Sequence, residues 1–261
     1  QVSKSVFNSS ITTYRDSPCT YVLYYSVMPA KNSIKIFVEN GFYHIYNRGA
    51  NKQEIYNNPQ DYAVFLKYLK EGLSPPTRPD ELETFEVNIK GTTFISPKRQ
   101  PKNFFGEIDL IAYVLMPNHF HLLIKQNKSE SMEAFMRSVA TRYSMYFNKA
   151  HNRVGTLFQS VYKAVLIENE NYLLHLSRYI HLNPKENFPN LISAYSSYAD
   201  YIGDKHTPWV NPMPVLNFFN NPVNPEFKKV NNYHDFVEKY EDNNRVKENF
   251  LAYLTLEESE S

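Results

Sequence analysis

Met116-Pro117-Asn118-His119-Phe120-His121-Leu122-Leu123-Ile124 is the most informative stretch of this chain, because it places two histidines inside an apolar segment. Residues 110–115 are rich in β-branched and aromatic side chains, so the pattern predicts two strands joined by a Pro-Asn turn. Alternate side chains of a strand share a face, so His119 and His121 project together while Phe120 enters the core. Imidazoles about 6 to 7 Å apart on one face can bind one divalent ion. Such a pair can also be two half-buried histidines without a ligand.

A second segment has the spacing of a helix: Tyr172-Leu173-Leu174-His175-Leu176-Ser177-Arg178-Tyr179-Ile180-His181-Leu182-Asn183-Pro184. Its apolar residues recur every three or four positions and its proline cannot continue a helix, so the pattern predicts about three turns. Tyr179 and Asn183 then lie one turn apart on one face, whereas Ile180 turns towards the packing side. A tyrosine hydroxyl, an amide oxygen and a histidine pair are the parts of a site for metal-assisted nucleophilic attack on phosphorus.

The remaining patterns predict an α+β fold in which the elements follow the order β-α-β-β-α-β. This is the order of a ferredoxin-like sandwich, an antiparallel sheet with helices on one face. Residues 74–107 interrupt it as a polar, proline-containing excursion with a minor hairpin at 85–89 and 93–95, and a helical extension follows near the C-terminus. Besides the strand pair and the tyrosine helix, the expected elements are strands over 41–48 and 162–167 and helices over 59–72, 130–150 and 233–254.

Five motifs occur in the order typical of one known family and together cover about residues 41–203. The histidine segment and Arg178–Pro184 are two of them, and the other three are Tyr43-His44-Ile45-Tyr46-Asn47-Arg48-Gly49, Gly155-Thr156-Leu157-Phe158-Gln159 with Tyr162-Lys163-Ala164, and Ser196-Ser197-Tyr198. The chain resembles the single-tyrosine HUH transposases of insertion sequences, and most closely their REP-associated branch.

The resemblance implies a metal-dependent transposase that cleaves and transfers single-stranded DNA with hairpin or palindromic ends. His119 and His121 would bind Mg²⁺ or Mn²⁺, and Asn183 would complete the metal shell. Tyr179 would be the nucleophile, leaving a 5′-phosphotyrosine link and a free 3′ hydroxyl. Family members occur both as homodimers and as monomers, so the oligomeric state is left open.

Other polar and aromatic residues have alternative assignments. Arg48 is expected to contact a DNA phosphate or to cap its strand end, and Lys163 and Arg178 are expected to neutralise DNA phosphates. Tyr143 and Tyr146 are rival nucleophiles, for which packing or base stacking is the preferred interpretation. His175 and His181 flank Tyr179 and are interpreted as helix-surface histidines, with a proton relay as the alternative.

Charge is distributed unevenly along the 261 residues. Residues 231–261 hold three basic and eight acidic side chains, which leaves 25 basic against 19 acidic in residues 1–230. The net positive charge of residues 1–230 suits DNA binding, and the net negative charge of residues 231–261 would repel DNA. A positive excess of this size also occurs in proteins that bind no nucleic acid. The 21 tyrosines and 18 phenylalanines suit base stacking, but most are expected in the core.

A single cysteine, Cys19, rules out an internal disulfide and indicates a reducing compartment. No apolar stretch reaches the length of about 18 residues that spans a bilayer, so a cytoplasmic, nucleoid-associated bacterial protein without a membrane partner is expected. Residues 1–27 are interpreted as a disordered or upstream extension before Met28, followed by a transposase domain over 28–203 and a C-terminal extension over 204–261 with an acidic helix.

Three classes of function remain open from the sequence. The first is the DNA strand transferase that uses Tyr179. The second is a ferredoxin-like binder of single-stranded nucleic acid without catalysis. The third is a metal phosphodiesterase that attacks with water, for which His119 but not Tyr179 would be essential. The intact set of His119, His121, Tyr179 and Asn183 favours the first.

Overall fold

A computed structural model describes residues 37–188, 190–220, 230 and 232–239. The described strands are β1 (Phe42–Arg48), β2 (Thr84–Ile89), β3 (Thr92–Pro97), β4 (Ile108–Met116), β5 (His119–Gln126) and β6 (Lys163–Ile167). The described α-helices are α1 (Pro59–Leu73), α2 (Ser131–Ala150), α3 (Glu170–Leu182), α4 (Tyr198–Tyr201), α5 (Met213–Asn220) and α6 (Tyr233–Glu238).

The main sheet has four strands in the order β4-β5-β1-β6, and each neighbouring pair is antiparallel. With α1 between β1 and β4 and α2 between β5 and β6, this is the arrangement of a ferredoxin-like βαββαβ sandwich. The predicted fold class is therefore confirmed. The register sets Arg48 opposite His119 and Tyr46 opposite His121, so the end of β1 lies beside the histidine pair.

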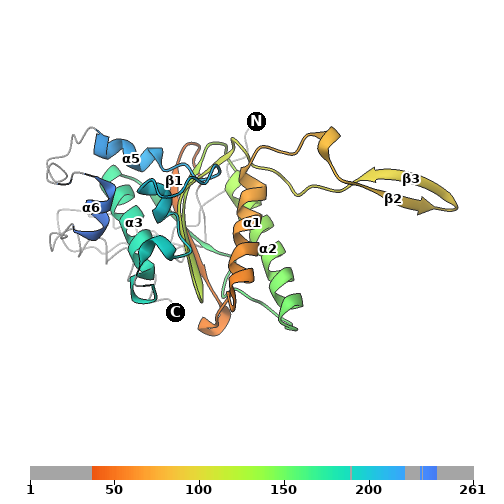
Figure 1. The fold of residues 1–261 in the computed structure, drawn as a ribbon, viewed down its shortest axis with the longest axis horizontal. Coiled ribbons are helices and arrows are strands. Elements are labelled where there is room, and N and C mark those ends of the chain that lie inside the picture. Colours follow the sequence, from red (N-terminus) through yellow and green to blue (C-terminus); the bar gives the residue numbers. More distant parts are fainter. Residues whose placement is uncertain (1–36, 189, 221–229, 231, 240–261) are drawn as a thin grey trace, which may run out of the picture. The chain divides into compact units, whose positions relative to one another are not determined.

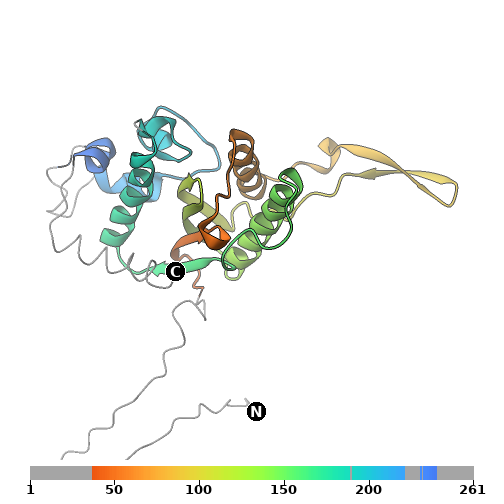
Figure 2. The same cartoon turned by 90° about the horizontal axis from the view of Figure 1, so that it is seen from below.

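Helices cover both faces of this sheet, whereas the sequence predicted helices on one face. Helices α1 and α2 lie side by side against one face and α3 lies against the other (Figures 1 and 2). The reason is that β4 and β5 are apolar on both faces, as is usual for strands buried from both sides. In β5, Phe120 and Leu122 belong to the core under α1 and α2, and Leu123 belongs to the core under α3.

Capping residues set where α1 and α3 begin. The Asn58 side chain accepts from the backbone N–H of Asp61 at the start of α1, and Asn169 accepts from Tyr172 at the start of α3. Helix α3 begins two residues before the predicted segment, because Asn169 caps it. It ends at Leu182, where Asn183–Glu186 continues as a 3-10 turn that contains Pro184.

The excursion contains the predicted hairpin as a separate two-stranded sheet, β2–β3. Residues 195–211 follow the outer edge of β4. The backbone N–H of Ser197 donates to the Tyr113 carbonyl, and the backbone N–H of Asn211 donates to the Leu110 carbonyl. This segment covers an edge that would otherwise expose unpaired backbone groups.

Helices α5 and α6 pack against α3, with Val215, Tyr233 and Phe236 buried in the same core. The predicted tail helix thus starts at Tyr233 as expected, but its predicted continuation over 240–254 lies outside the described residues, as does the expected extension over 1–27. The domain limits at residues 28 and 203 stay predictions. In the described part of the chain, no helix is both long enough and apolar enough to cross a membrane.

Candidate functional site

The two histidines of β5 share the face of the sheet that α3 covers. Their ring centroids are 5.1 Å apart, and the rings meet edge to face. His121 is almost fully buried and His119 is partly buried. The predicted projection of both rings to one face is confirmed, because Phe120 between them packs in the core on the opposite face.

Helix α3 brings the predicted tyrosine and amide to these histidines. The ring of Tyr179 lies 5.4 Å from the ring of His121, again edge to face. The Oδ1 atom of Asn183, one turn later, lies 3.3 Å from Nε2 of His119. Ile180 is completely buried in the core under α3, as its predicted orientation requires. Four residues from two distant segments therefore meet at one place, while their chemical roles stay predictions.

Burial disfavours the charged form of both histidines. It lowers the pKa of His119, and it lowers the pKa of His121 further, with added repulsion from His44 and His119. Neutral imidazole is the form that binds a metal ion. Adjacent ligands of an octahedral ion, at about 2.1 Å each, lie about 3.0 Å apart, which is close to the 3.3 Å between His119 Nε2 and Asn183 Oδ1. The spacing of His119 Nε2 and Asn183 Oδ1 is therefore compatible with two ligands of one divalent ion, and the ring of His121 lies beside that of His119. The metal-binding role of His119, His121 and Asn183 stays a prediction, and no group of three His, Cys, Asp or Glu side chains within the described residues is arranged to hold an ion.

His44 is a further histidine at the site, and the sequence interpretation gave it no role. Its Nε2 lies 2.9 Å from Nδ1 of His121, the two rings stack at 5.0 Å, and its side chain is completely buried. His44 and His121 are 77 residues apart in sequence. The ferredoxin-like order, which sets the first strand beside the third, was the signal that could have brought them together.

The predicted DNA-binding residues occupy different surroundings. The Arg48 Nε and Nη2 atoms donate to Oε1 of Gln159 at 3.3 and 3.2 Å, at an exposed place next to His119 in the sheet register. Lys163 Nζ lies 5.8 Å from the ring centroid of Tyr46, which stands opposite His121. A DNA contact of either residue stays a prediction.

Arg178 is engaged with the C-terminal part of the chain. Its Nε atom donates to the carbonyl of Phe236 at 2.7 Å, and its guanidinium lies 5.9 Å from the Phe236 ring centroid. These contacts join α3 to α6. The predicted contact of Arg178 with DNA is untested.

The interpretation of His175 and His181 as helix-surface residues was wrong. Both are buried, because α5, α6 and the segment after α3 cover this side of the helix. His181 Nδ1 lies 2.7 Å from the Tyr233 hydroxyl and its Nε2 lies 2.8 Å from Ser197 Oγ. Burial lowers the pKa of His181 to about 3, so it is a neutral histidine within the core.

The rival nucleophiles lie on α2, which covers the opposite face of the sheet. Tyr143 is completely buried and its hydroxyl donates to the Ile55 carbonyl at 2.5 Å. The Tyr146 hydroxyl donates to Oδ1 of Asp61 at 3.0 Å. Burial raises the pKa of both tyrosines, which opposes formation of a phenolate. The preferred interpretation of Tyr143 as a packing residue is confirmed.

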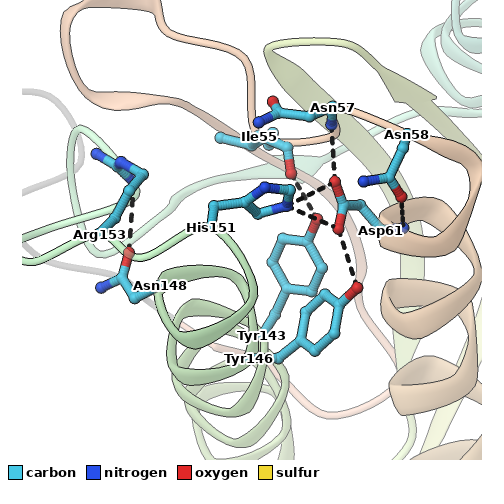
Figure 3. A network of polar contacts seen from close by, with 9 residues as sticks. All are labelled: Ile55, Asn57, Asn58, Asp61, Tyr143, Tyr146, Asn148, His151 and Arg153. Carbon is cyan, nitrogen blue, oxygen red and sulfur yellow. Dashed lines mark hydrogen bonds and ion pairs between the residues drawn. The ribbon is translucent and has the colours of Figure 1, made fainter.

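A buried carboxylate, that of Asp61, holds the loop between β1 and α1 (Figure 3). Asp61 is completely buried and accepts from Tyr146, from the Asn57 backbone N–H at 2.8 Å and from His151 Nε2 at 3.0 to 3.1 Å. The same loop donates two backbone hydrogen bonds to the Pro117 carbonyl, from Ile55 at 2.7 Å and from Tyr56 at 3.1 Å. The turn before His119 is therefore anchored to α1 and α2.

Comparison with known proteins identifies the segment that carries the site. The family model described as "Transposase IS200 like" matches residues 104–183, which include both histidines, Tyr179 and Asn183. The resemblance predicted from the motifs is thus confirmed over this part of the chain. A solved structure described as the REP-associated tyrosine transposase bound to a REP hairpin has a TM-score of 0.43 and 12% identity, covering 68% of this chain and 92% of that chain. No curated protein matches the sequence.

Proposed function

We propose that this chain is a transposase that cleaves and rejoins single-stranded DNA, with Tyr179 as the nucleophile and a divalent ion held by His119, His121 and Asn183. The single observation that carries the proposal is the meeting of these residues on the α3 face of the sheet. The Tyr179 ring lies against His121, and Asn183 Oδ1 lies within one ligand spacing of His119 Nε2. The match of residues 104–183 to IS200-like transposases supports it.

The reaction exchanges one phosphodiester bond for another. The Tyr179 oxygen forms a bond to phosphorus and loses its proton, while the bond from phosphorus to the 3′ oxygen breaks and that oxygen gains a proton. The product is a 5′-phosphotyrosine link, and attack on it by a 3′ hydroxyl reverses the step without another energy source. Tyrosine has an ordinary pKa of about 10, so it needs an aligned phosphate and nearby positive charge. A bound Mg²⁺ or Mn²⁺ would polarise a non-bridging oxygen of the scissile phosphate.

The DNA would lie along the sheet end formed by the last residues of β1 and the first residues of β5 and β6. Arg48 on β1 and Lys163 on β6 are at this end, and both strands lie on the same side of the histidine strand β5, away from β4. Guanidinium and ammonium groups at these positions suit phosphates of a single strand that passes Tyr179. We propose hairpin or palindromic DNA ends as the substrate class.

A covalent-trapping assay tests this function. The full chain is incubated with labelled single strands from the DNA that flanks its gene, with Mn²⁺, with Mg²⁺ or with EDTA. We expect a metal-dependent protein–DNA band that resists denaturation, and we expect Tyr179→Phe and His119→Ala to abolish it. Tyr68→Phe is the matched control, because this tyrosine lies on α1, on the face of the sheet opposite Tyr179, and it should leave the band unchanged.

The other outcomes identify the competing functions. Cleavage that survives Tyr179→Phe but not His119→Ala would overturn the proposal in favour of a water-using phosphodiesterase. Tight binding without cleavage of any flanking strand would overturn it in favour of a non-catalytic nucleic-acid-binding protein.

A further inference from the structure

The side chain of Asn118 makes two hydrogen bonds that fix its orientation. Its Nδ2 atom donates to the Lys52 carbonyl at 3.3 Å, and its Oδ1 atom lies 2.7 Å from Nδ1 of His119. A backbone carbonyl can only accept, so the amide nitrogen must face Lys52 and the amide oxygen must face the imidazole. The oxygen in turn requires a proton on Nδ1 of His119. The other nitrogen of the neutral ring, Nε2, then carries the lone pair.

This tautomer directs a lone pair of His119 at another acceptor. Nε2 faces Oδ1 of Asn183 at 3.3 Å, and neither atom has a proton to share when His119 is protonated on Nδ1 alone. Two acceptors at this distance repel each other, so either a cation lies between them or the Asn183 amide turns to let its Nδ2 donate to Nε2. In both cases Nε2 of His119 acts as the acceptor, which is the form that a cation requires.

His44 contacts the Nδ1 atom of His121, as Asn118 contacts the Nδ1 atom of His119. Its Nε2 lies 2.9 Å from Nδ1 of His121, and the stacked rings are held on adjacent strands. One of these two nitrogens must carry the proton. If His121 donates, its Nε2 carries the lone pair; if His44 donates, His121 is protonated on Nε2 and that nitrogen cannot bind a metal. The assignment of the donor to His121 rests on the proposed function.

We infer that Asn118 and His44 are positioning residues that hold His119 and His121 as Nδ1–H tautomers, so that both Nε2 atoms are available to one divalent ion. The backbone around Asn118 supports this role. Its carbonyl accepts from Gly49 at 2.8 Å, and the neighbouring Pro117 carbonyl accepts from Ile55 and Tyr56. The acceptor for His119 thus belongs to a turn that is fixed at several points. Hydrogen bonds of this kind orient metal-binding histidines and raise their basicity.

The tautomers can be read directly in the metal-free full chain. With ¹⁵N-labelled histidine, long-range proton–nitrogen correlation spectra distinguish a protonated ring nitrogen from one with a lone pair, and His119→Gln and His121→Gln assign the two rings by loss of signal. We expect protonated Nδ1 and unprotonated Nε2 in both rings. A protonated Nε2 on either ring would overturn the inference for that ring.

Paired variants test whether Asn118 and His44 cause this state. Asn118→Ala removes the acceptor and Asn118→Asp keeps an oxygen; His44→Phe keeps an aromatic ring without an acceptor and His44→Gln keeps one. We expect Asn118→Ala and His44→Phe to alter the tautomer of the adjacent ring and to weaken Mn²⁺ binding by about 10- to 100-fold, measured by calorimetry. Asn118→Asp should bind Mn²⁺ more tightly than Asn118→Ala, and His44→Gln should bind it more tightly than His44→Phe. Asn88→Ala, an exposed asparagine of β2, is the control and should change neither property.

The measurements separate this inference from the proposed function. Unchanged tautomers and Mn²⁺ affinity in folded Asn118→Ala and His44→Phe would refute the positioning roles, even where the wild type forms the covalent DNA band. Nδ1–H tautomers that depend on these residues would support the inference, even where no covalent band forms and the proposed function fails. Thermal unfolding of each variant identifies those that are folded.

Discussion

Replacing Asp61 by alanine should destabilise the protein more than almost any other single change to a charged residue. Its carboxylate is completely buried and accepts from three groups: the Asn57 backbone N–H, the Tyr146 hydroxyl and His151 Nε2. Alanine leaves all three donors without this acceptor. A buried donor left unsatisfied costs about 1 to 3 kcal/mol, but His151 is one-fifth exposed and can regain water. We therefore expect a loss of about 3 kcal/mol in the free energy of unfolding.

Thermal unfolding followed by circular dichroism measures this loss. For a chain of this size, about 3 kcal/mol corresponds to a decrease of roughly 6 to 12 °C in Tm. The control is Asp80→Ala, which removes an exposed carboxylate and should change the free energy of unfolding by less than about 0.5 kcal/mol. If Asp61→Ala unfolds within 1 °C of the wild type, the buried network does not hold α1, α2 and the loop together, and the reasoning is refuted.

Two further predictions concern pH and salt. The pKa of His181 is about 3 in the folded chain and about 6.5 in the unfolded chain, so between these pH values only the unfolded chain binds a proton at this histidine. The free energy of unfolding should therefore fall as the pH drops below about 6.5, by up to about 1.4 kcal/mol per pH unit. His181→Gln should flatten that slope between pH 7 and pH 5 in urea titrations, and an unchanged slope would contradict the assignment. Lys163→Ala should lower the slope of log K against log salt for single-stranded DNA by about 0.7, in a filter-binding or fluorescence assay. Lys67→Ala, which removes an exposed lysine of α1, should leave the slope unchanged. Equal slopes in both variants would exclude Lys163 from the DNA contact.

The side-chain positions that were predicted correctly lie within single elements with a clear period, while the chemical roles of these residues stay predictions. The two-residue period of β5 set His119 and His121 on one face, and the helical period of α3 set Tyr179 one turn from Asn183. Each inference needed only local geometry. Their meeting in space needed the fold, and the βαββαβ order was itself predictable from alternating strand and helix patterns.

The features that were missed depend on contacts between segments far apart in the chain. His44 contacts His121 because β1 pairs with β5, and nothing within its own strand marks it as a partner of His121. His175 and His181 were placed on the surface because the sequence of α3 does not show what covers it. Their burial comes from segments that follow α3 by tens of residues, including Tyr233 and Phe236 of α6. A helical pattern predicts on which face of the helix a side chain lies, but not which later segment of the chain packs against that face.

The stability of the fold and the geometry of the site depend on the same alternation in β5. Phe120, Leu122 and Ile124 fill the core under α1 and α2, which forces His119 and His121 to the α3 face. A shift of one residue in the pairing of β5 would bury both imidazoles among aromatic side chains and expose Phe120 to the site. The apolar side chains that never touch a substrate therefore exclude the wrong register. Because a large apolar core resists that shift, the sheet alone can hold the two histidine ring centroids 5.1 Å apart.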